Sequence, residues 1–238
     1  MILGSLPFIL YLQTLKGDFS AIFKDSQVQF FIFLVIISIL IVTFWRYQNT
    51  ASLFNNFRPA FFNTISIFTG TGYSTQDFNS CGPFIIILFL FLMLVGGCAG
   101  STTCGIKIFR LQILYQSAKV QIFKLLNPHG VSLAKYNKKP VSGDITSSVM
   151  GYFFMFIISY IIIALILSFL GNDFLTSLSG AATSLANVGP GLGNVIGPTK
   201  TFAELSDITK WVLISGMLIG RLELLSVFII LTPAFWRN

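Results

Sequence analysis

Long apolar stretches alternate along the chain with short polar stretches that are rich in glycine. Three of the apolar stretches approach the roughly 20 residues that a membrane-crossing helix requires, and they lie at 28–45, 149–170 and 211–231. Two others, at 60–68 and 174–188, are about half a membrane thick, and each runs into a glycine-rich turn. The pattern predicts an all-α integral membrane protein in which full-length and half-length helices alternate.

The order of these elements occurs twice. Each unit has an outer helix, a half-length helix, a glycine-rich turn and a second long helix. An internal repeat of this kind is a stronger guide to the fold than the features of any single segment. We therefore predict two tandem repeats of helix, pore helix, filter loop and helix. The first covers 27–125, with outer helix 28–45, pore helix 59–69, turn 70–74 and a broken inner helix 83–125. The second covers 146–238, with the same elements at 147–170, 173–186, 187–191 and 210–232. Residues 1–15 are expected to be the tail of a preceding membrane helix, and 16–26 and 126–145 to be cytoplasmic loops.

The composition indicates a membrane protein and argues against nucleic-acid binding. The chain is 54% hydrophobic and 10% charged, whereas soluble domains carry about 25% charged residues. Its net charge of +7 is concentrated, because seven of the fifteen Lys and Arg residues lie between Lys107 and Lys139, between apolar segments. That distribution is typical of a cytoplasmic loop under the positive-inside rule.

The charge distribution also tests the topology. If each half-length helix dips into the membrane and returns to the same side, ten basic residues lie inside: Lys16, Lys24, Lys107, Arg110, Lys119, Lys124, Lys135, Lys138, Lys139 and Arg237. Four lie outside: Arg46, Arg58, Lys200 and Lys210. Arg221 remains within the membrane. A full crossing by either half-length helix would move basic loops outside, so the ratio favours the re-entrant arrangement.

The turns "GTGYS" (70–74) and "NVGPG" (187–191) occupy the same place in the two units. Backbone carbonyl oxygens can replace the water around a permeating cation when successive carbonyls point at one axis. Such backbone needs glycine, and a half-length helix presents its partly negative C-terminal end to the cation. A plain hairpin turn is the alternative, but two turns at matching positions favour a filter. The candidate filter residues are Gly70, Thr71, Gly72, Tyr73, Asn187, Val188, Gly189 and Pro190.

The inner helix of the first unit is interrupted by "GGCAGSTTCG", residues 96–105. Each glycine weakens a helix by about 1 kcal/mol relative to alanine, and irregular backbone at membrane depth must be buried in protein or line water. The lack of a GK[ST] ending and of a preceding strand argues against a phosphate-binding loop. Close helix packing through a GxxxG pair is the alternative to an intramembrane gate. The candidate gating residues are Gly96, Gly97, Gly100, Ser101, Gly105 and Arg221.

Arg221 lies near the middle of the last apolar stretch. A charge there costs about 2.5–3.5 kcal/mol on insertion scales, so it is expected to face the protein interior. Glu223 is a poor partner, because residues i and i+2 lie on roughly opposite faces of a helix. We expect Arg221 to pair with polar backbone of the loop 96–105.

The remaining residues do not indicate an enzyme. Cys81, Cys98 and Cys104 form no CxxC pair, and the sequence shows no Ser/His/Asp set, carboxylate pair or metal-ligand cluster. The only metal expected is potassium at the filter carbonyls. The loop 126–145 is either a short hairpin that docks a cytoplasmic partner or a basic loop that sets orientation.

Four segments carry a resemblance to a known family: "TGTGYSTQDF", "GGCAGSTTCGIKIFR", "ANVGPGLGNVIGP" and "GRLELLSVFIILTPAFW". They resemble TrkH-type potassium uptake membrane subunits of the Trk/Ktr/HKT superfamily, over nearly the whole chain. The resemblance implies four pore units around one pore, with Gly72 and Gly189 as filter glycines of the third and fourth units. It also implies that 96–105 is the gating loop and Arg221 the pore arginine.

The resemblance further implies a homodimer in the bacterial inner membrane, a cytoplasmic nucleotide-binding regulator of the TrkA type, potassium as substrate and no cofactor. The first two units of the family are missing from this chain, so it would supply half of a four-unit pore. A second copy or a separate amino-terminal half would complete it. The expected function is potassium uptake through a gated channel-like pore; a non-conducting remnant or assembly subunit is the alternative.

Overall fold

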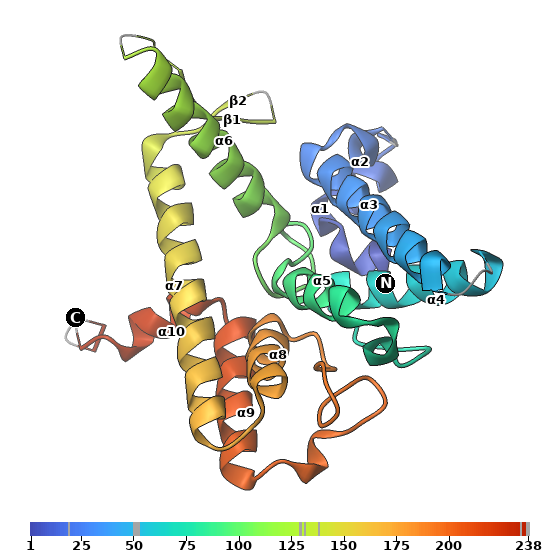
Figure 1. Ribbon diagram of the computed structural model, residues 1–238. Coiled ribbons are helices and arrows are strands. Elements are labelled where there is room, and N and C mark those ends of the chain that lie inside the picture. The colour runs from blue at the N-terminus through green and yellow to red at the C-terminus, as the bar shows by residue number, and fades with distance from the viewer. Residues whose placement is uncertain are drawn as a thin grey trace.

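The computed structural model describes residues 1–18, 20–49, 53–128, 130, 132–137, 139–233 and 235–236 (Figure 1). Lys138 and Arg237, two of the basic residues that the charge pattern assigns to the inside, lie outside the described residues. The described chain is mostly helical, and its named strands are β1 (Lys135–Tyr136) and β2 (Lys139–Pro140), which form an antiparallel hairpin. The loop 126–145 therefore contains a hairpin, one of the two forms that the sequence allowed.

The first unit contains four of the helices. They are α3 (Ser26–Asn49), α4 (Leu53–Phe68), α5 (Pro83–Leu94) and α6 (Ile108–Leu126), with a short 3-10 turn, η2, at Phe78–Cys81. Asp25 caps α3, because its Oδ1 accepts the amide N–H groups of Gln27 and Val28. The helix α4 begins six residues before the predicted pore helix, and it carries Pro59 within it rather than near its start.

The second unit has the same order of elements. Its helices are α7 (Gly143–Phe169), α8 (Phe174–Ala186), α9 (Asp207–Arg221) and α10 (Leu224–Leu231), with a short 3-10 turn, η3, at Phe202–Glu204. Asp173 caps α8 by accepting the Thr176 N–H, and Ser206 caps α9 by accepting the Thr209 N–H. Within the described residues, α3 and α7 are each long and apolar enough to cross a membrane.

The predicted continuous inner helix at 210–232 is wrong. The chain forms α9 and α10 instead, bent by 105° at Leu222 and Glu223, and Glu223 has a positive φ of 55°. The reason lies in the side chains on either side of the break. On one continuous helix Arg221 and Glu223 would point to roughly opposite faces, but the break lets both line the same cavity against the first unit. The pair α9 and α10 counts as a third span only if it is treated as one broken span.

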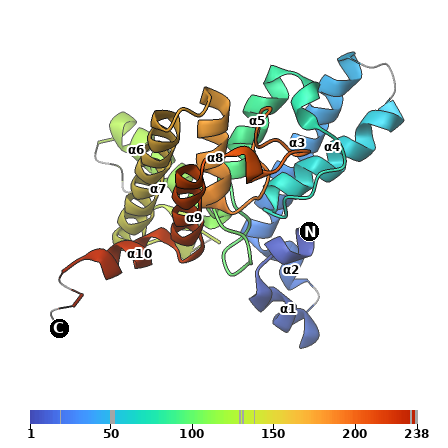
Figure 2. The ribbon, with the colours of Figure 1, turned by 90° about the horizontal axis from the view of Figure 1, so that it is seen from below.

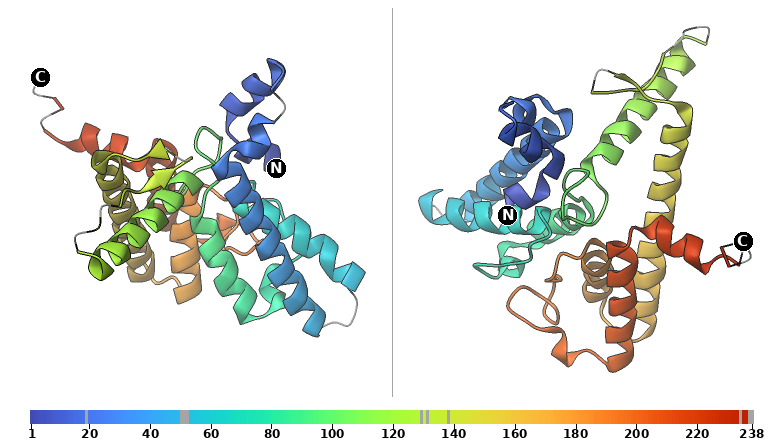
Figure 3. Two further views of the ribbon diagram at one scale, coloured as in Figure 1. Left: turned by 90° about the horizontal axis from the view of Figure 1, so that it is seen from above. Right: turned by 180° about the vertical axis from the view of Figure 1, so that it is seen from behind.

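The N-terminal residues form a 3-10 turn, η1 (Ile2–Ser5), and two short helices, α1 (Phe8–Leu15) and α2 (Ala21–Lys24). They lie beside the start of α3 in Figure 3. In Figure 1, α6, the hairpin and the start of α7 extend to one end of the molecule, and the segment leading into α9 lies at the other end. Helix α6 and the hairpin, which carry much of the basic segment 107–139, thus lie far from the segment that leads into α9.

The two units share one packed interior. α8 lies between α7, α9 and α5 (Figure 2). Small side chains make this possible, since every residue from Ser179 to Ala186 is buried and none is larger than leucine. The core of the first unit, with Phe31, Phe68 and Phe89 fully buried, continues into Ala182 and Val188 of the second. The glycine-rich turns of the two units are therefore held in one rigid environment.

Candidate functional site

The two glycine-rich turns face each other in direct backbone contact. A Cβ atom added to Gly72 would overlap the carbonyl oxygen of Val188, and it would lie 3.1 Å from Cδ of Pro190. A Cβ added to Gly189 would lie 3.6 Å from Cα of Gly72. No other residue type fits at Gly72 without displacing the neighbouring turn, so this glycine is required by the approach of the second unit.

The turns also have the same internal geometry. Gly70 and Asn187 occupy equivalent left-handed positions, with φ of 62° and 52°. Gly70 lies two residues after the end of α4, and Asn187 directly follows α8. Each turn is closed by the same hydrogen bond: Thr71 N–H donates to Ser66 O over 2.9 Å, and Val188 N–H donates to Thr183 O over 3.1 Å. Asparagine tolerates the left-handed conformation better than most residues, which explains how it replaces glycine at the first position of the second turn.

The carbonyl groups of the turns are left without protein partners. Within the described residues, no hydrogen bond ends on the carbonyl oxygens of 70–73 or 187–190. The amide groups, in contrast, donate back to the preceding helices, and Gly189 N–H reaches Thr183 Oγ1 over 2.9 Å. Unpaired carbonyls that gather at the C-terminal ends of two helices create a region of negative potential. Such an arrangement can coordinate a cation that has lost its water.

Polar side chains fasten the outer ends of the turns across the two units. Asn79 donates from Nδ2 to Gly193 O over 3.1 Å, and its Oδ1 accepts Gly193 N–H over 3.0 Å. Ser74 Oγ donates to Pro198 O over 3.1 Å. Within the first unit, Asn63 Oδ1 accepts the N–H of Thr75 over 3.0 Å. These residues were not among those expected from the sequence, because an isolated Asn or Ser beside a turn carries no distinctive signal.

The loop 96–105 leaves and rejoins the inner helix through a narrow neck. Gly96 N–H donates to Ile106 O, and Ile106 N–H donates to Leu94 O, each over 2.9 Å. A Cβ on Gly96 would overlap the carbonyl oxygen of Cys104, and one on Gly105 would lie 3.5 Å from Cβ of Ala186. The glycines therefore permit two backbone segments to touch, and the neck lies against the last residue of α8, next to the second turn.

Inside the loop, hydroxyl groups replace helical hydrogen bonds. Thr103 Oγ1 accepts the Gly97 N–H over 2.8 Å and lies 2.8 Å from Ser101 Oγ. The N-terminal segment supports the loop from outside, since Cys98 N–H donates to Ser5 O and Phe8 N–H donates to Gly100 O. Gly100 has a φ of 73°, and within the described structure its Cβ position has no atom within 4 Å.

Arg221 contacts the loop in the way that the sequence favours. Its Nη1 donates to Thr102 O over 2.9 Å and lies 3.6 Å from Cys104 Sγ. Helix α9 packs closely against α8 because Gly220 has no side chain: a Cβ at this position would overlap the carbonyl oxygen of Leu185. The structure thus brings together both turns, the loop and Arg221, all of which were expected from the sequence to be site residues.

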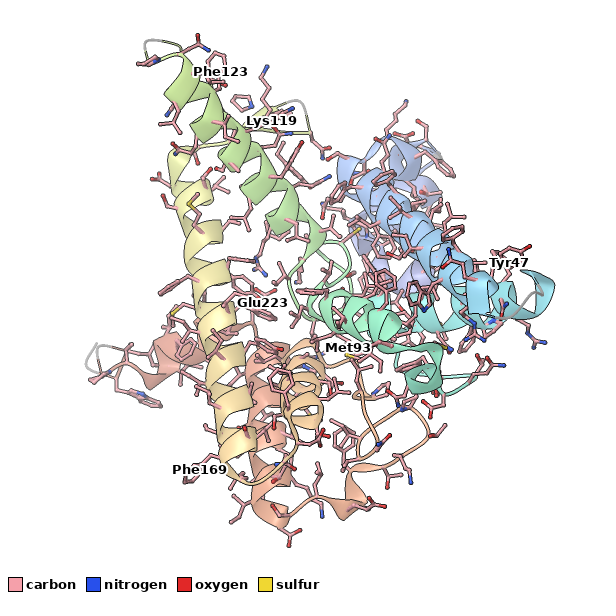
Figure 4. The ribbon with its side chains drawn as sticks, in the orientation of Figure 1. Tyr47, Met93, Lys119, Phe123, Phe169 and Glu223 are labelled. Atoms are coloured by element: carbon pink, nitrogen blue, oxygen red, sulfur yellow. The ribbon has the colours of Figure 1, made fainter. Side chains whose placement is uncertain are left out.

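An ion cluster lies beside Arg221. Glu223 Oε1 pairs with Lys107 Nζ over 2.7 Å, and its Oε2 lies 3.7 Å from Arg110 Nη2. The guanidinium group of Arg110 also lies 3.6 Å from the centre of the Tyr152 ring. Figure 4 labels Glu223 beside α7, at the turn from α9 into α10. Together with residues 101–105 and Arg221, these side chains line a cavity of about 250 Å³.

Comparison with known proteins gives consistent matches. The family model TrkH, described as a cation transport protein, matches residues 21–237. The Trk system potassium uptake protein TrkI of Halomonas elongata is 45% identical over 238 residues, which cover 100% of this chain and 48% of that protein. The Trk system potassium uptake protein TrkH of Vibrio parahaemolyticus is 34% identical over 217 residues, covering 90% of this chain and 44% of that protein.

A solved structure is also similar. The crystal structure of the potassium transporter TrkH from Vibrio parahaemolyticus superposes with a TM-score of 0.90 at 32% sequence identity, covering 99% of this chain and 51% of that chain. The chain spans about half the length of the curated relatives that it matches.

Proposed function

The chain belongs to the TrkH family of cation transport proteins, and we propose that it supplies two pore units of a potassium uptake channel. The observation that carries this proposal is the contact of Gly72 with the Val188 carbonyl, which places two turns with unpaired carbonyl oxygens side by side. The names of the relatives add potassium as the transported ion.

In this proposal the turns 70–74 and 187–191 form two walls of a selectivity filter. A potassium ion exchanges its water for the carbonyl oxygens of Gly70, Thr71, Gly72 and Tyr73 on one side. The carbonyls of Asn187, Val188, Gly189 and Pro190 act on the other side. Conduction requires binding that is strong enough to replace hydration and weak enough to release the ion, which neutral carbonyl dipoles provide better than a carboxylate does. No cofactor takes part.

The loop 96–105 acts as the gate below this filter. Its neck lies against Ala186, and Arg221 fastens Thr102 while it adds a positive charge to the pathway. In the closed state the charge repels an entering cation and the loop fills the space. Opening requires the loop to swing out about the glycines Gly96, Gly97 and Gly105, and the open space at Gly100 permits such a movement.

The pore is completed by further units. A ring of four pore units needs two more turns than the two that this chain provides, and a second copy or an amino-terminal half supplies them. The family resemblance adds a homodimer and a cytoplasmic nucleotide-binding regulator of the TrkA type. The membrane concerned is the bacterial inner membrane, with the basic segment 107–139 on the cytoplasmic side.

A second candidate function is that of a non-conducting assembly subunit. The two candidates differ in the part played by the turns, because only conduction depends on them.

The test is growth at limiting potassium of a bacterium that lacks its own potassium uptake systems. The chain is expressed alone and together with the amino-terminal half of a relative. Growth that is restored in either case, and lost on Gly189→Ala, supports the channel. Failure of the wild-type chain in both cases, with the protein present in the membrane, would overturn the proposal in favour of the assembly subunit.

A further inference from the structure

The loop 96–105 is held by side chains from two directions. Within the described residues, Arg221 and Gln27 are the two side chains outside the loop that hydrogen-bond to its backbone. Arg221 donates to Thr102 O, and Gln27 Oε1 accepts the Ala99 N–H over 2.9 Å. Gln27 comes from the first turn of α3, in the first unit, and it is 9% exposed. The two contacts therefore fix the loop from different units.

The first turn of α3 is joined to the hairpin β1–β2. Asn137, in the hairpin turn, accepts the Ser26 N–H with its Oδ1 over 3.1 Å. Its Nδ2 donates to Asp25 Oδ2 over 3.3 Å, and Asp25 is the residue that caps α3. The side chain thus holds both the cap and the first residue of the helix. Figure 1 shows the hairpin extending toward this end of α3.

Two further features bear on this junction. Gln112, on α6, donates from Nε2 to Ser26 O over 2.9 Å. Burial raises the pKa of the Tyr136 hydroxyl, in β1, and the Asp25 carboxylate raises it further. The start of α3 is thus held between the hairpin, α6 and the loop 96–105.

We propose that Gln27 is a second positioning residue for the loop, and that the hairpin acts on the loop through Asn137, the first turn of α3 and Gln27. This inference rests on the proposed role of 96–105 as the gate. Arg221 fastens the loop from the side of the pathway with a charge. Gln27 holds the loop from the cytoplasmic end with a neutral amide. A cytoplasmic partner that binds the hairpin can release this Gln27 contact.

The test is amide hydrogen exchange of the segment 96–105, measured by mass spectrometry on the purified protein in detergent. Gln27→Leu removes the acceptor while it keeps the bulk of the side chain. We expect exchange in this segment to rise about fivefold, as for the loss of one ordinary hydrogen bond. Gln27→Glu keeps an acceptor oxygen, so exchange of the segment 96–105 in this variant should stay as slow as in the wild type. Gln29→Leu is the matched control, because Gln29 is exposed on the same helix and donates to Phe23 O instead.

Unchanged exchange of 96–105 in Gln27→Leu would overturn the assignment. An increase of equal size in α7 would mark general unfolding and would also count against it.

The link to the hairpin is tested with Asn137→Gly. Asn137 has a φ of 47°, and glycine keeps that conformation without strain while it removes the side chain. Faster exchange of 96–105 in this variant supports the link, and unchanged exchange overturns it. Potassium flux is recorded separately. If Gln27→Leu loosens the loop and flux through a conducting channel stays the same, the gate role fails while the contact itself stands, so the two failures are distinguishable.

Discussion

Arg221 and Thr102 join the two units across the proposed ion pathway. The guanidinium Nη1 of Arg221, the last residue of α9, donates to the carbonyl oxygen of Thr102 over 2.9 Å. The inner helix of the second unit thereby fastens the loop that interrupts the inner helix of the first. A hydrogen bond from a charged donor contributes about 1.5–3 kcal/mol, which is more than an ordinary neutral one.

Replacing Arg221 by Ala is therefore expected to raise the basal rate of potassium flux. The loop loses its charged anchor and the pathway loses a repelling charge, so the rate should rise about tenfold or more. The measurement is rubidium uptake into liposomes that contain the conducting assembly. Lys210→Ala is the control, since Lys210 lies on the same helix in an exposed pair with Asp207, 3.2 Å away. An Arg221→Ala rate equal to that of the wild type would contradict the gate role.

The ion pair of Lys107 with Glu223 is expected to stabilise the break between α9 and α10. Lys107→Glu places two carboxylates together and should lower the melting temperature. Adding Glu223→Lys should recover part of the loss, and Arg110, 3.7 Å from Glu223, limits the recovery. Because Glu223 is 52% exposed, the coupling should amount to about 1 kcal/mol or less. A double-mutant cycle of melting temperatures in detergent measures it, and strictly additive effects would show that the pair does not couple.

Sequence alone can place the long helices α3 and α7, the two turns and the interruption at 96–105. These features depend on apolar length and on glycine content, which are local properties of the chain. The contact of Arg221 with the loop could also be anticipated, because a charge at membrane depth needs a polar partner and the broken helix offers one. The equivalence of the two turns followed from the repeat.

The break at Leu222 and Glu223 could not be predicted, because the apolar stretch 211–231 gives no local reason for it. Its cause is tertiary: Arg221 and Glu223 both bind residues of the first unit, which one straight helix would not allow. The partners of Asn79 and Gln27 lie 114 and 72 positions away in the sequence. Contacts of that separation leave no periodic or local signal.

Gly220→Ala is expected to destabilise the packing of α9 on α8. A Cβ at this position would overlap the carbonyl oxygen of Leu185, and overpacking of this kind costs about 1–3 kcal/mol. Gly151→Ala is the matched control, because Gly151 is exposed within α7 and no atom of the described structure lies within 4 Å of its Cβ position. Thermal unfolding in detergent should show a lower midpoint for Gly220→Ala and an unchanged or higher one for Gly151→Ala. Equal midpoints would mean that α9 can shift away from α8 at little cost.

Asn79 is expected to support the discrimination between potassium and sodium although it lies outside the turns. Its amide makes a reciprocal pair of hydrogen bonds with Gly193, at 3.1 and 3.0 Å, and so holds the segment after the second turn against the first unit. Asn79→Ala removes both bonds, which together contribute about 1–3 kcal/mol. The turns should then move apart more readily, and sites shaped for the larger ion should lose part of their preference. Asn194→Ala is the control, since Asn194 directly follows Gly193 in the chain and its side chain is exposed.

The ratio of potassium to sodium permeability, taken from reversal potentials or competing uptake, should fall severalfold in Asn79→Ala and stay unchanged in Asn194→Ala. Asn79→Asp sharpens the test: its carboxylate still accepts the Gly193 N–H but cannot donate to the Gly193 carbonyl. An intermediate ratio for Asn79→Asp would assign separate effects to the two bonds. A wild-type ratio in Asn79→Ala would show that contact at Gly72 alone is enough to keep the turns in place.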